Sequence, residues 1–299
     1  MSKQYKAPLG ASLVVLSSVF YASYGIWTKL MGNFFGGYTA SGLRSILVVL
    51  LLLPPAFVYH GFEPVRWRKN WRHLAGLLAG SLFIWGPLYY AILHAGVGIS
   101  LTINYASIVI GMFFFGWLLN KERFTRDKLL ATVLGFVGLA CIFSPSTHGI
   151  GMLPLLASVL SGLSAAANAV IAKKISYNAT QATIALWVTS AVASLAMALL
   201  IREPAPAVGW HMQWLYLLIF AAASVVASWS LVKGIKLIEA GAAGILGLLE
   251  IVFGVLFGVL FFHEHVSVLV MVGILTILAA AAIPYIKDYS DKKGTLGAE

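Results

Sequence analysis

Ten long apolar stretches, each close to the length of a membrane-spanning helix, follow one another along the chain. An α-helix rises about 1.5 Å per residue, so about 20 apolar residues cross the hydrocarbon core of a bilayer. The stretches therefore predict an all-α integral membrane protein with ten transmembrane helices and little mass outside the bilayer. They cover residues 9–29, 36–58, 74–95, 97–119, 128–144, 150–172, 180–201, 214–237, 240–262 and 266–286.

The composition agrees with this class and excludes others. Of 299 residues, 60% are apolar and 10% are charged, whereas soluble domains carry about 25% charged residues. The net charge of +10 could indicate nucleic-acid binding, but no soluble domain is available to carry a basic face, so no nucleic-acid partner is expected. The single cysteine, Cys141, excludes an internal disulfide and a cysteine-based metal or redox site.

Basic residues fall almost entirely on one side of the predicted helices. With ten spans, nearly all lysines and arginines lie in loops on the side of the two termini; Lys29 and Arg202 lie opposite, and Arg44 lies within the second span. Because basic loops stay in the cytoplasm, both termini are predicted to be cytoplasmic in a multi-pass protein of the cell (inner, cytoplasmic) membrane. The basic loops also favour contact with anionic membrane lipid.

The two halves of the chain repeat one another. LSSVFYASYGIWTKL from Leu16 aligns with LSGLSAAANAVIAKK from Leu160, which places Lys29 opposite Lys173. The fourth and ninth spans end alike, in WLLNKER and LFFHEHV, and we pair the glutamates of these two ends, Glu122 and Glu264. Five spans per half is an odd number, so the second repeat enters the membrane inverted relative to the first.

This repeat gives a predicted organisation and a mechanism. Inverted repeats are common in secondary transporters, where exchange of conformation between two similar halves opens a midplane site to each side in turn. The expected units are a cytoplasmic N-terminus (1–8), a first repeat (9–148), a second repeat (149–286) and a polar cytoplasmic tail (287–299).

The residue pattern resembles the EamA family of the drug/metabolite transporter superfamily over 9–286. The resemblance rests on the Ser/Ala/aromatic-rich first helix, Arg44 in GLRSILVVLLLLP, and the glutamates that close the fourth and ninth helices. It implies a transporter whose central cavity is lined mainly by helices 1, 3, 4, 6, 8 and 9. One departure is Glu250, which many members follow with proline and which precedes Ile251 here, so a proline kink is not expected, although Gly254 and Gly258 could permit bending.

Two ionisable residues lie deep within predicted spans. Glu250 is about 15 Å into the ninth span, where a carboxylate is costly, so it is a candidate proton-coupling or cation-binding group; the alternative is a neutral glutamic acid in an interhelical hydrogen bond. Arg44 is about 12 Å inside the second span and needs an acceptor. It could contact an anionic substrate group, but we favour a structural contact with helix-end carbonyls or a glutamate.

Aromatic and amide side chains give further candidates for substrate contacts. Tyr24, Trp85, Tyr89 and Trp229 lie away from the predicted interfaces and are expected in a cavity wall, although interface anchoring is the commoner role of membrane aromatics. The candidate polar contacts are Asn104 and Asn168, for which interhelical hydrogen bonding is equally plausible.

Two local motifs give structural expectations. Gly86-Pro87 should break or kink the third span, because proline lacks the amide that a helix interior needs. In the His263-Glu264-His265 sequence, histidines two positions apart point away from each other on a helix, so no metal site and no cofactor are predicted.

The leading functional hypothesis is a secondary transporter, a probable exporter of small amphipathic metabolites such as amino acids, acting as a monomer or homodimer. An intramembrane enzyme is the alternative, but no HExxH or GxSxG motif and no catalytic constellation are present. A non-transporting scaffold is a third alternative, and the absence of a P-loop argues against ATP-driven pumping by this chain alone.

Overall fold

The computed structural model describes residues 7–58, 67–123, 125–143, 151–175, 178–207 and 209–296, and all regular structure in these ranges is helical. The helices are α1 (Ala7–Ala22), α2 (Tyr24–Met31), α3 (Gly37–Val58), α4 (Trp67–Ala95), α5 (Val97–Asn120), α6 (Arg126–Phe143), α7 (Met152–Lys174), α8 (Ala179–Leu200), α9 (Met212–Ile235), α10 (Ala240–Gly247), α11 (Leu249–Phe262) and α12 (Val268–Leu296).

Within the described ranges, eight helical segments are long and apolar enough to cross a membrane, so the chain is a multi-pass membrane protein. Two of the ten predicted spans are not among the eight. One corresponds to α6, whose first three residues are charged, and the other to α12, whose apolar part covers only Val268–Ile283. The eight segments are Ala7–Met31, Gly37–Val58, Asn70–Ile92, Ile99–Asn120, Met152–Lys174, Ala179–Leu200, Met212–Ile235 and Ala240–Phe262.

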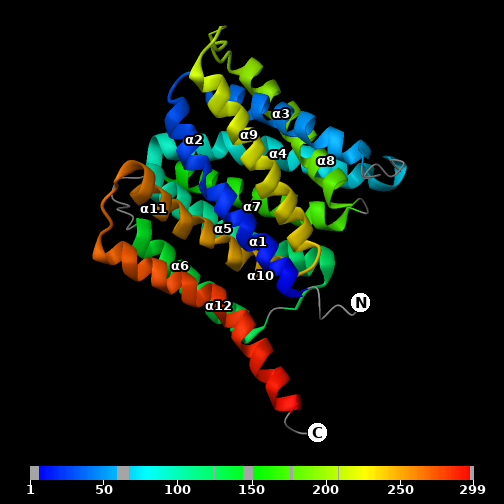
Figure 1. Cartoon of the computed structure of the whole chain (residues 1–299), viewed down its shortest axis with the longest axis vertical. Coiled ribbons are helices and arrows are strands. Elements are labelled where there is room, and N and C mark those ends of the chain that lie inside the picture. Colours follow the sequence, from blue (N-terminus) through cyan, green and yellow to red (C-terminus); the bar gives the residue numbers. More distant parts are fainter. Residues whose placement is uncertain are drawn as a thin grey trace.

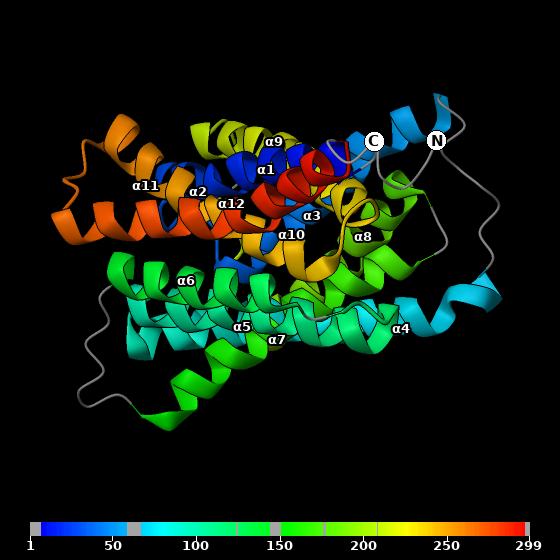
Figure 2. The same cartoon turned by 90° about the horizontal axis from the view of Figure 1, so that it is seen from below.

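The helices pack in two layers with shorter elements between them. Figure 2 shows α4, α5 and α7 in one layer and α1, α2 and α9 in the other, with α10 lying between. Within this arrangement α7 packs on both α4 and α5, α3 on α8, and α1 on α9. Helices α6 and α12 run side by side along one edge of the bundle (Figure 1).

Glycine permits the close approach of α6 and α12. A side chain added at Gly138 would place its Cβ 2.8 Å from the carbonyl oxygen of Gly273, closer than two such atoms can come. Small residues at helix contacts let backbones approach closely in membranes, where packing replaces the hydrophobic effect as the driving force. The two glycines therefore fix α6 and α12 as a pair.

The predicted first and ninth spans are each divided into two helices. The first is interrupted at Ser23, between α1 and α2, and the ninth at Leu248, between α10 and α11. At Leu248 the backbone makes tight turns, because Leu248 N bonds Ile245 O and Ile251 N bonds Leu248 O, each at 3.1 Å. This interruption lies two residues before Glu250 and needs no proline.

A break or kink of the third span at Gly86-Pro87 was expected, and no break is found, since α4 continues without interruption from Trp67 to Ala95. A transmembrane helix tolerates proline when neighbouring helices or side chains satisfy the freed carbonyl. Gly86 has a different role, since its missing side chain leaves space that the Tyr38 hydroxyl occupies. The motif therefore allows close packing of α4 on α3.

Candidate functional site

A cavity of about 390 Å³ lies in the centre of the bundle. The described residues that line it come from every helix except α6 and α12. Its volume is that of a small-molecule site, which in proteins is typically about 300–1,000 Å³ and mainly apolar. Six residues proposed from the sequence line this cavity: Tyr24, Arg44, Trp85, Asn104, Asn168 and Glu250.

Arg44 lies in an aromatic cage at the cavity. Its side chain comes from α3 and the residue is only 3% exposed. Among the described residues no hydrogen-bond acceptor is paired with it, and its buried Nε has no partner. The guanidinium carbon instead faces four aromatic rings, at centroid distances of 4.3 Å to Phe220, 4.8 Å to Tyr24, and 5.3 Å to both Trp85 and Trp187.

This arrangement differs from the structural contact favoured by the sequence analysis. Among the described residues, no helix-end carbonyl and no glutamate accepts a hydrogen bond from Arg44. Cation–π contacts stabilise the buried charge, but ring faces accept no bidentate hydrogen bonds, which are the preferred partners of a guanidinium. Arg44 therefore lies beside the cavity with hydrogen-bonding capacity that an anionic group could use.

Glu250 makes one hydrogen bond at the cavity. The Tyr105 hydroxyl, from α5, donates to its Oε1 at 2.8 Å. This interhelical contact joins the start of α11 to the middle of α5, and both residues line the cavity. The contact agrees with the structural interpretation of Glu250, and the cavity position agrees with the functional one, so the two roles are compatible.

Tyr21 and Tyr24 line the same cavity as the two charged groups. The Tyr24 ring centroid lies 4.8 Å from the guanidinium carbon of Arg44. The two tyrosine rings contact each other edge to face, with centroids 5.1 Å apart. The cavity wall thus contains a cation, a carboxyl group and an aromatic surface.

The two predicted amides are held by side chains of neighbouring helices. Asn104 Nδ2 donates to Ser161 Oγ at 2.9 Å, and Ser161 Oγ donates to Ile84 O at 2.7 Å. Asn168 Nδ2 donates to Ser81 Oγ at 3.1 Å, while its buried Oδ1 has no hydrogen-bond partner among the described residues. Interhelical bonding therefore accounts for the Asn104 donor and leaves one acceptor on Asn168 for another molecule.

Two predicted residues are not brought to the cavity wall. Trp229 is absent from its lining; the indole Nε1 donates to Thr180 Oγ1 at 3.1 Å, and Lys233 Nζ lies 4.4 Å from its ring centroid. The side chain of Tyr89 lies outside the described residues, although its backbone belongs to α4. Tyr105 was missed by the sequence analysis, and only a search for a partner of Glu250 could have indicated it.

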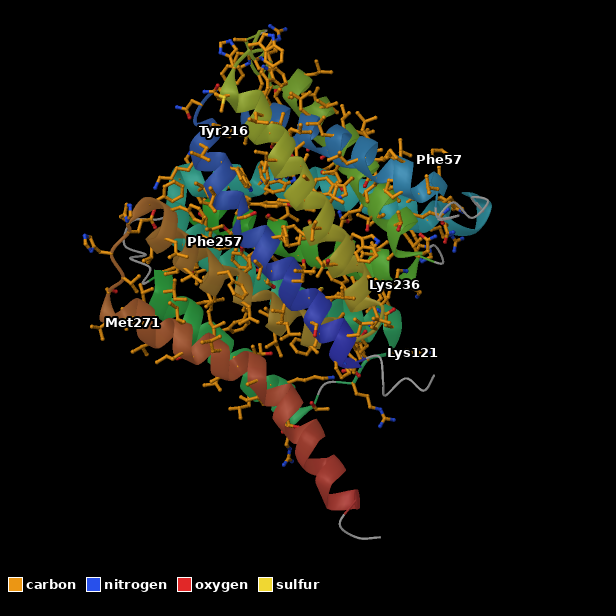
Figure 3. All side chains as sticks on the ribbon, viewed as in Figure 1. Phe57, Lys121, Tyr216, Lys236, Phe257 and Met271 are labelled. Atoms are coloured by element: carbon orange, nitrogen blue, oxygen red, sulfur yellow. The ribbon has the colours of Figure 1, made fainter. Side chains whose placement is uncertain are left out.

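A network of charged residues lies away from the cavity, where α5 and α7 end and α10 begins. Lys173 Nζ bonds Glu122 Oε1 at 2.6 Å, and Lys128 pairs with Glu239. Lys236 Nζ donates to the carbonyls of Lys173 and Ile175 at 3.3 and 2.9 Å. Burial lowers the pKa of the Lys236 ammonium from its usual value. Figure 3 shows Lys236 and Lys121 at this same end of the bundle.

The described residues contain no group of three or more histidine, cysteine, aspartate or glutamate side chains placed to hold a metal ion. Glu264, part of the sequence motif considered as a metal site, instead pairs with Lys29 at 3.2 Å.

The helices and the cavity define a multi-pass membrane protein with a central site of small-molecule size. The model of a family described as the EamA-like transporter family matches the chain twice, over residues 8–144 and 152–285. The chain therefore belongs to the EamA-like transporter family, as the sequence resemblance predicted.

Two curated relatives are each named an uncharacterized transporter, from Helicobacter pylori strains J99 / ATCC 700824 and ATCC 700392 / 26695. Each is 26% identical over 157 residues, which are 52% of this chain and 51% of the relative, so the chain spans about half the length of these relatives. A solved structure titled "Crystal structure of protein" has the same fold, with a TM-score of 0.77 at 15% identity, covering 95% of this chain and 98% of that one.

Proposed function

We propose that this protein is a secondary transporter that exports small amphipathic metabolites such as amino acids across the cell membrane. The observation that carries the proposal is the central cavity, which combines Arg44, Glu250 and an aromatic wall in about 390 Å³. Family membership and the names of the curated relatives favour transport over the alternative of an intramembrane enzyme.

The charge arrangement suits a zwitterion. Arg44 has no acceptor among the described residues, so a substrate carboxylate would supply the hydrogen-bonding partner that the aromatic cage lacks. Glu250 would receive the ammonium group of the same molecule. The apolar part of the substrate would lie along Tyr21, Tyr24 and Trp85, which line the same cavity as the two charges.

Glu250 is also the proposed proton-coupling group. It is the only carboxyl group among the described residues of the cavity wall. A group that binds a substrate ammonium when ionised and a proton when empty would exchange one for the other, which couples export to proton entry. The Tyr105 hydroxyl would hold the carboxyl group in place in both states.

Alternating access is the proposed mechanism, between two inverted repeats of five spans. Two local features support this organisation. The family model matches once in each half, and the fourth and ninth spans end in the same left-handed cap, at Lys121 and His263. Ten spans with both termini in the cytoplasm, as the charge distribution of the sequence favours, place α6 and α12 at the end of the first and second repeat.

Substrate counterflow in proteoliposomes tests the proposal. The purified protein is reconstituted with an unlabelled metabolite inside, and accumulation of the same radiolabelled compound is measured for a panel of zwitterionic, anionic and cationic metabolites. We expect accumulation of unchanged zwitterions with an apolar side chain. Chemical conversion of the label would indicate an enzyme, and absence of accumulation for every compound would contradict transport.

A further inference from the structure

Two lysine–glutamate ion pairs occupy corresponding positions in the two halves of the chain. Lys173, at the end of α7, pairs with Glu122, which follows α5. Lys29, near the end of α2, pairs with Glu264, which follows α11. The alignment of the repeats places Lys29 opposite Lys173, and the similar helix ends pair Glu122 with Glu264. Each pair therefore joins the two halves, and the two pairs are made by equivalent helices.

The backbone around the two glutamates has the same geometry. Each follows a residue in the left-handed region that caps its helix, Lys121 with φ 57° and His263 with φ 53°. Each backbone amide returns to a glycine six positions earlier, Glu122 N to Gly116 O and Glu264 N to Gly258 O, both at 3.2 Å. This local match is independent of the sequence alignment and gives the same register.

The surroundings of the two pairs differ. The side chains of Glu122 and Lys173 are 12% and 17% exposed, whereas those of Glu264 and Lys29 are 58% and 55% exposed. The buried pair also holds the start of α10, because Lys173 Nζ donates to Ile238 O at 2.8 Å and Ala240 N donates to Glu122 Oε2 at 2.7 Å. This end of the bundle is closed by contacts that join the two halves.

At the other end the Lys29–Glu264 pair also joins the two halves, but among the described residues it has no counterpart of the hydrogen bonds that the buried end makes to the α9–α10 connection. The counterpart of the α9–α10 connection is the α4–α5 connection around Gly96, and no described hydrogen bond joins it to Glu264 or Lys29. The Lys29 ammonium instead lies 3.8 Å from the ring centroid of Phe262, on the helix that precedes Glu264. A Cβ added at Gly254 of α11 would meet no atom within 4 Å, whereas one at Gly244 of α10 would meet Met112 of α5.

We propose that the two pairs mark matched gates at opposite ends of the cavity. In this structure the Glu122–Lys173 gate is closed, and the Glu264–Lys29 gate is open because its ion pair, although formed, is exposed and has no described hydrogen bond to the α4–α5 connection. Movement of α11 toward the start of α5 would bury Glu264 and Lys29 against the α4–α5 connection, and the Glu122 gate would then open. The inference rests on the proposed transport function, because only a transporter needs the cavity to open to each side in turn.

Side-specific labelling of a cavity cysteine tests the gates without knowledge of the substrate. The background carries Cys141→Ser and Ala165→Cys, since Ala165 lines the cavity on α7. A membrane-impermeant maleimide is applied to right-side-out and inside-out membrane vesicles. We expect labelling from the Glu264 side and protection from the Glu122 side. Labelling of the background mainly from the Glu122 side would overturn the assignment of the closed gate.

Matched acid-to-amide variants distinguish the gates. Glu122→Gln should raise labelling from the Glu122 side by about tenfold or more. Removal of the carboxylate leaves the Lys173 ammonium largely buried without a charged partner, which strongly destabilises the closed gate. Glu264→Gln should change labelling from either side by about twofold or less, since exposed pairs contribute little, but should slow counterflow because the second gate cannot close. Equal labelling effects of the two variants would refute the proposal.

A charge swap separates pairing from misfolding. The double variant Glu122→Lys/Lys173→Glu re-forms the ion pair but loses the hydrogen bonds to Ile238 O and from Ala240 N, so it should restore part of the protection relative to either single variant. Elution of each variant as a single species in detergent checks its fold. If the single variants do not fold, the double variant alone tests the gate, because protection of the cavity cysteine from labelling on the Glu122 side then depends on the re-formed ion pair. Side-selective labelling without counterflow would contradict the proposed transport function alone, whereas counterflow with equal labelling effects of the two amide variants would contradict the gates alone.

Discussion

Replacement of Arg44 distinguishes substrate binding from a structural role. The guanidinium is buried against Phe220, Tyr24, Trp85 and Trp187 without an acceptor among the described residues. Lysine keeps the charge and the cation–π contacts but cannot make the bidentate pair that arginine makes with a carboxylate. A hydrogen bond to a charged group contributes about 1.5–3 kcal/mol, so Arg44→Lys should weaken apparent substrate affinity by about 10- to 150-fold.

The neutral variant Arg44→Met should change the stability of the fold only slightly. Burial of a cation costs on the order of several kcal/mol in lost hydration, and each cation–π contact stabilises the buried charge by about 0.5–2 kcal/mol. Four such contacts are of similar size to the penalty, so removal of the charge should leave the free energy of unfolding within about 2 kcal/mol of the wild type. A structural arginine would instead cause a large loss of stability.

The assay combines counterflow with thermal unfolding in detergent. Apparent affinity comes from the concentration of external substrate that gives half-maximal accumulation, and Arg126→Lys, at an exposed position at the start of α6, is the matched control. We expect weakened substrate affinity with unchanged thermal stability for Arg44→Lys. Unchanged affinity in a folded Arg44→Lys protein would refute direct contact between Arg44 and the substrate.

Three other predictions concern the cavity and its surroundings. Glu250→Gln should remove the response of counterflow to an imposed pH gradient, and an unchanged response over the whole pH range would argue against coupling through Glu250. Trp187→Phe removes the donor to Ser228 Oγ at 2.7 Å, so thermal unfolding should report a loss of about 1 kcal/mol. Trp229→Phe should change counterflow affinity by about twofold or less, because Trp229 lies outside the cavity; a larger effect would mean that substrate reaches it.

The transmembrane spans and the buried charges could be predicted from the sequence because both follow from the cost of placing polar groups in hydrocarbon. Water-free hydrocarbon demands about 20 apolar residues per helix, and it disfavours isolated charges, so Arg44 and Glu250 stand out within apolar runs. Both line the cavity. The count of ten spans was less well determined, because the charged start of α6 and the short apolar part of α12 weaken the length criterion.

The helix interruptions could not be predicted because they depend on partners from other helices. The interruption at Leu248 is accommodated by the Ser18 hydroxyl, which donates to Leu246 O at 3.3 Å across 228 residues of sequence. Pro87, the strongest local signal for a break, lies in a continuous helix. Tyr105 had no distinguishing signal, because its role depends on the approach of α11 to α5 and not on its own sequence neighbours.

Occlusion of the cavity is the most direct test of its role as the transport pathway. Ala169→Trp places an indole among the cavity-lining residues of α7, while Ala279→Trp places one on the exposed face of α12 as the matched control. Counterflow of a zwitterionic substrate is measured for both variants after each elutes as a single folded species. We predict that Ala169→Trp abolishes accumulation and that Ala279→Trp preserves it. Wild-type accumulation by a folded Ala169→Trp protein would show that substrate crosses elsewhere.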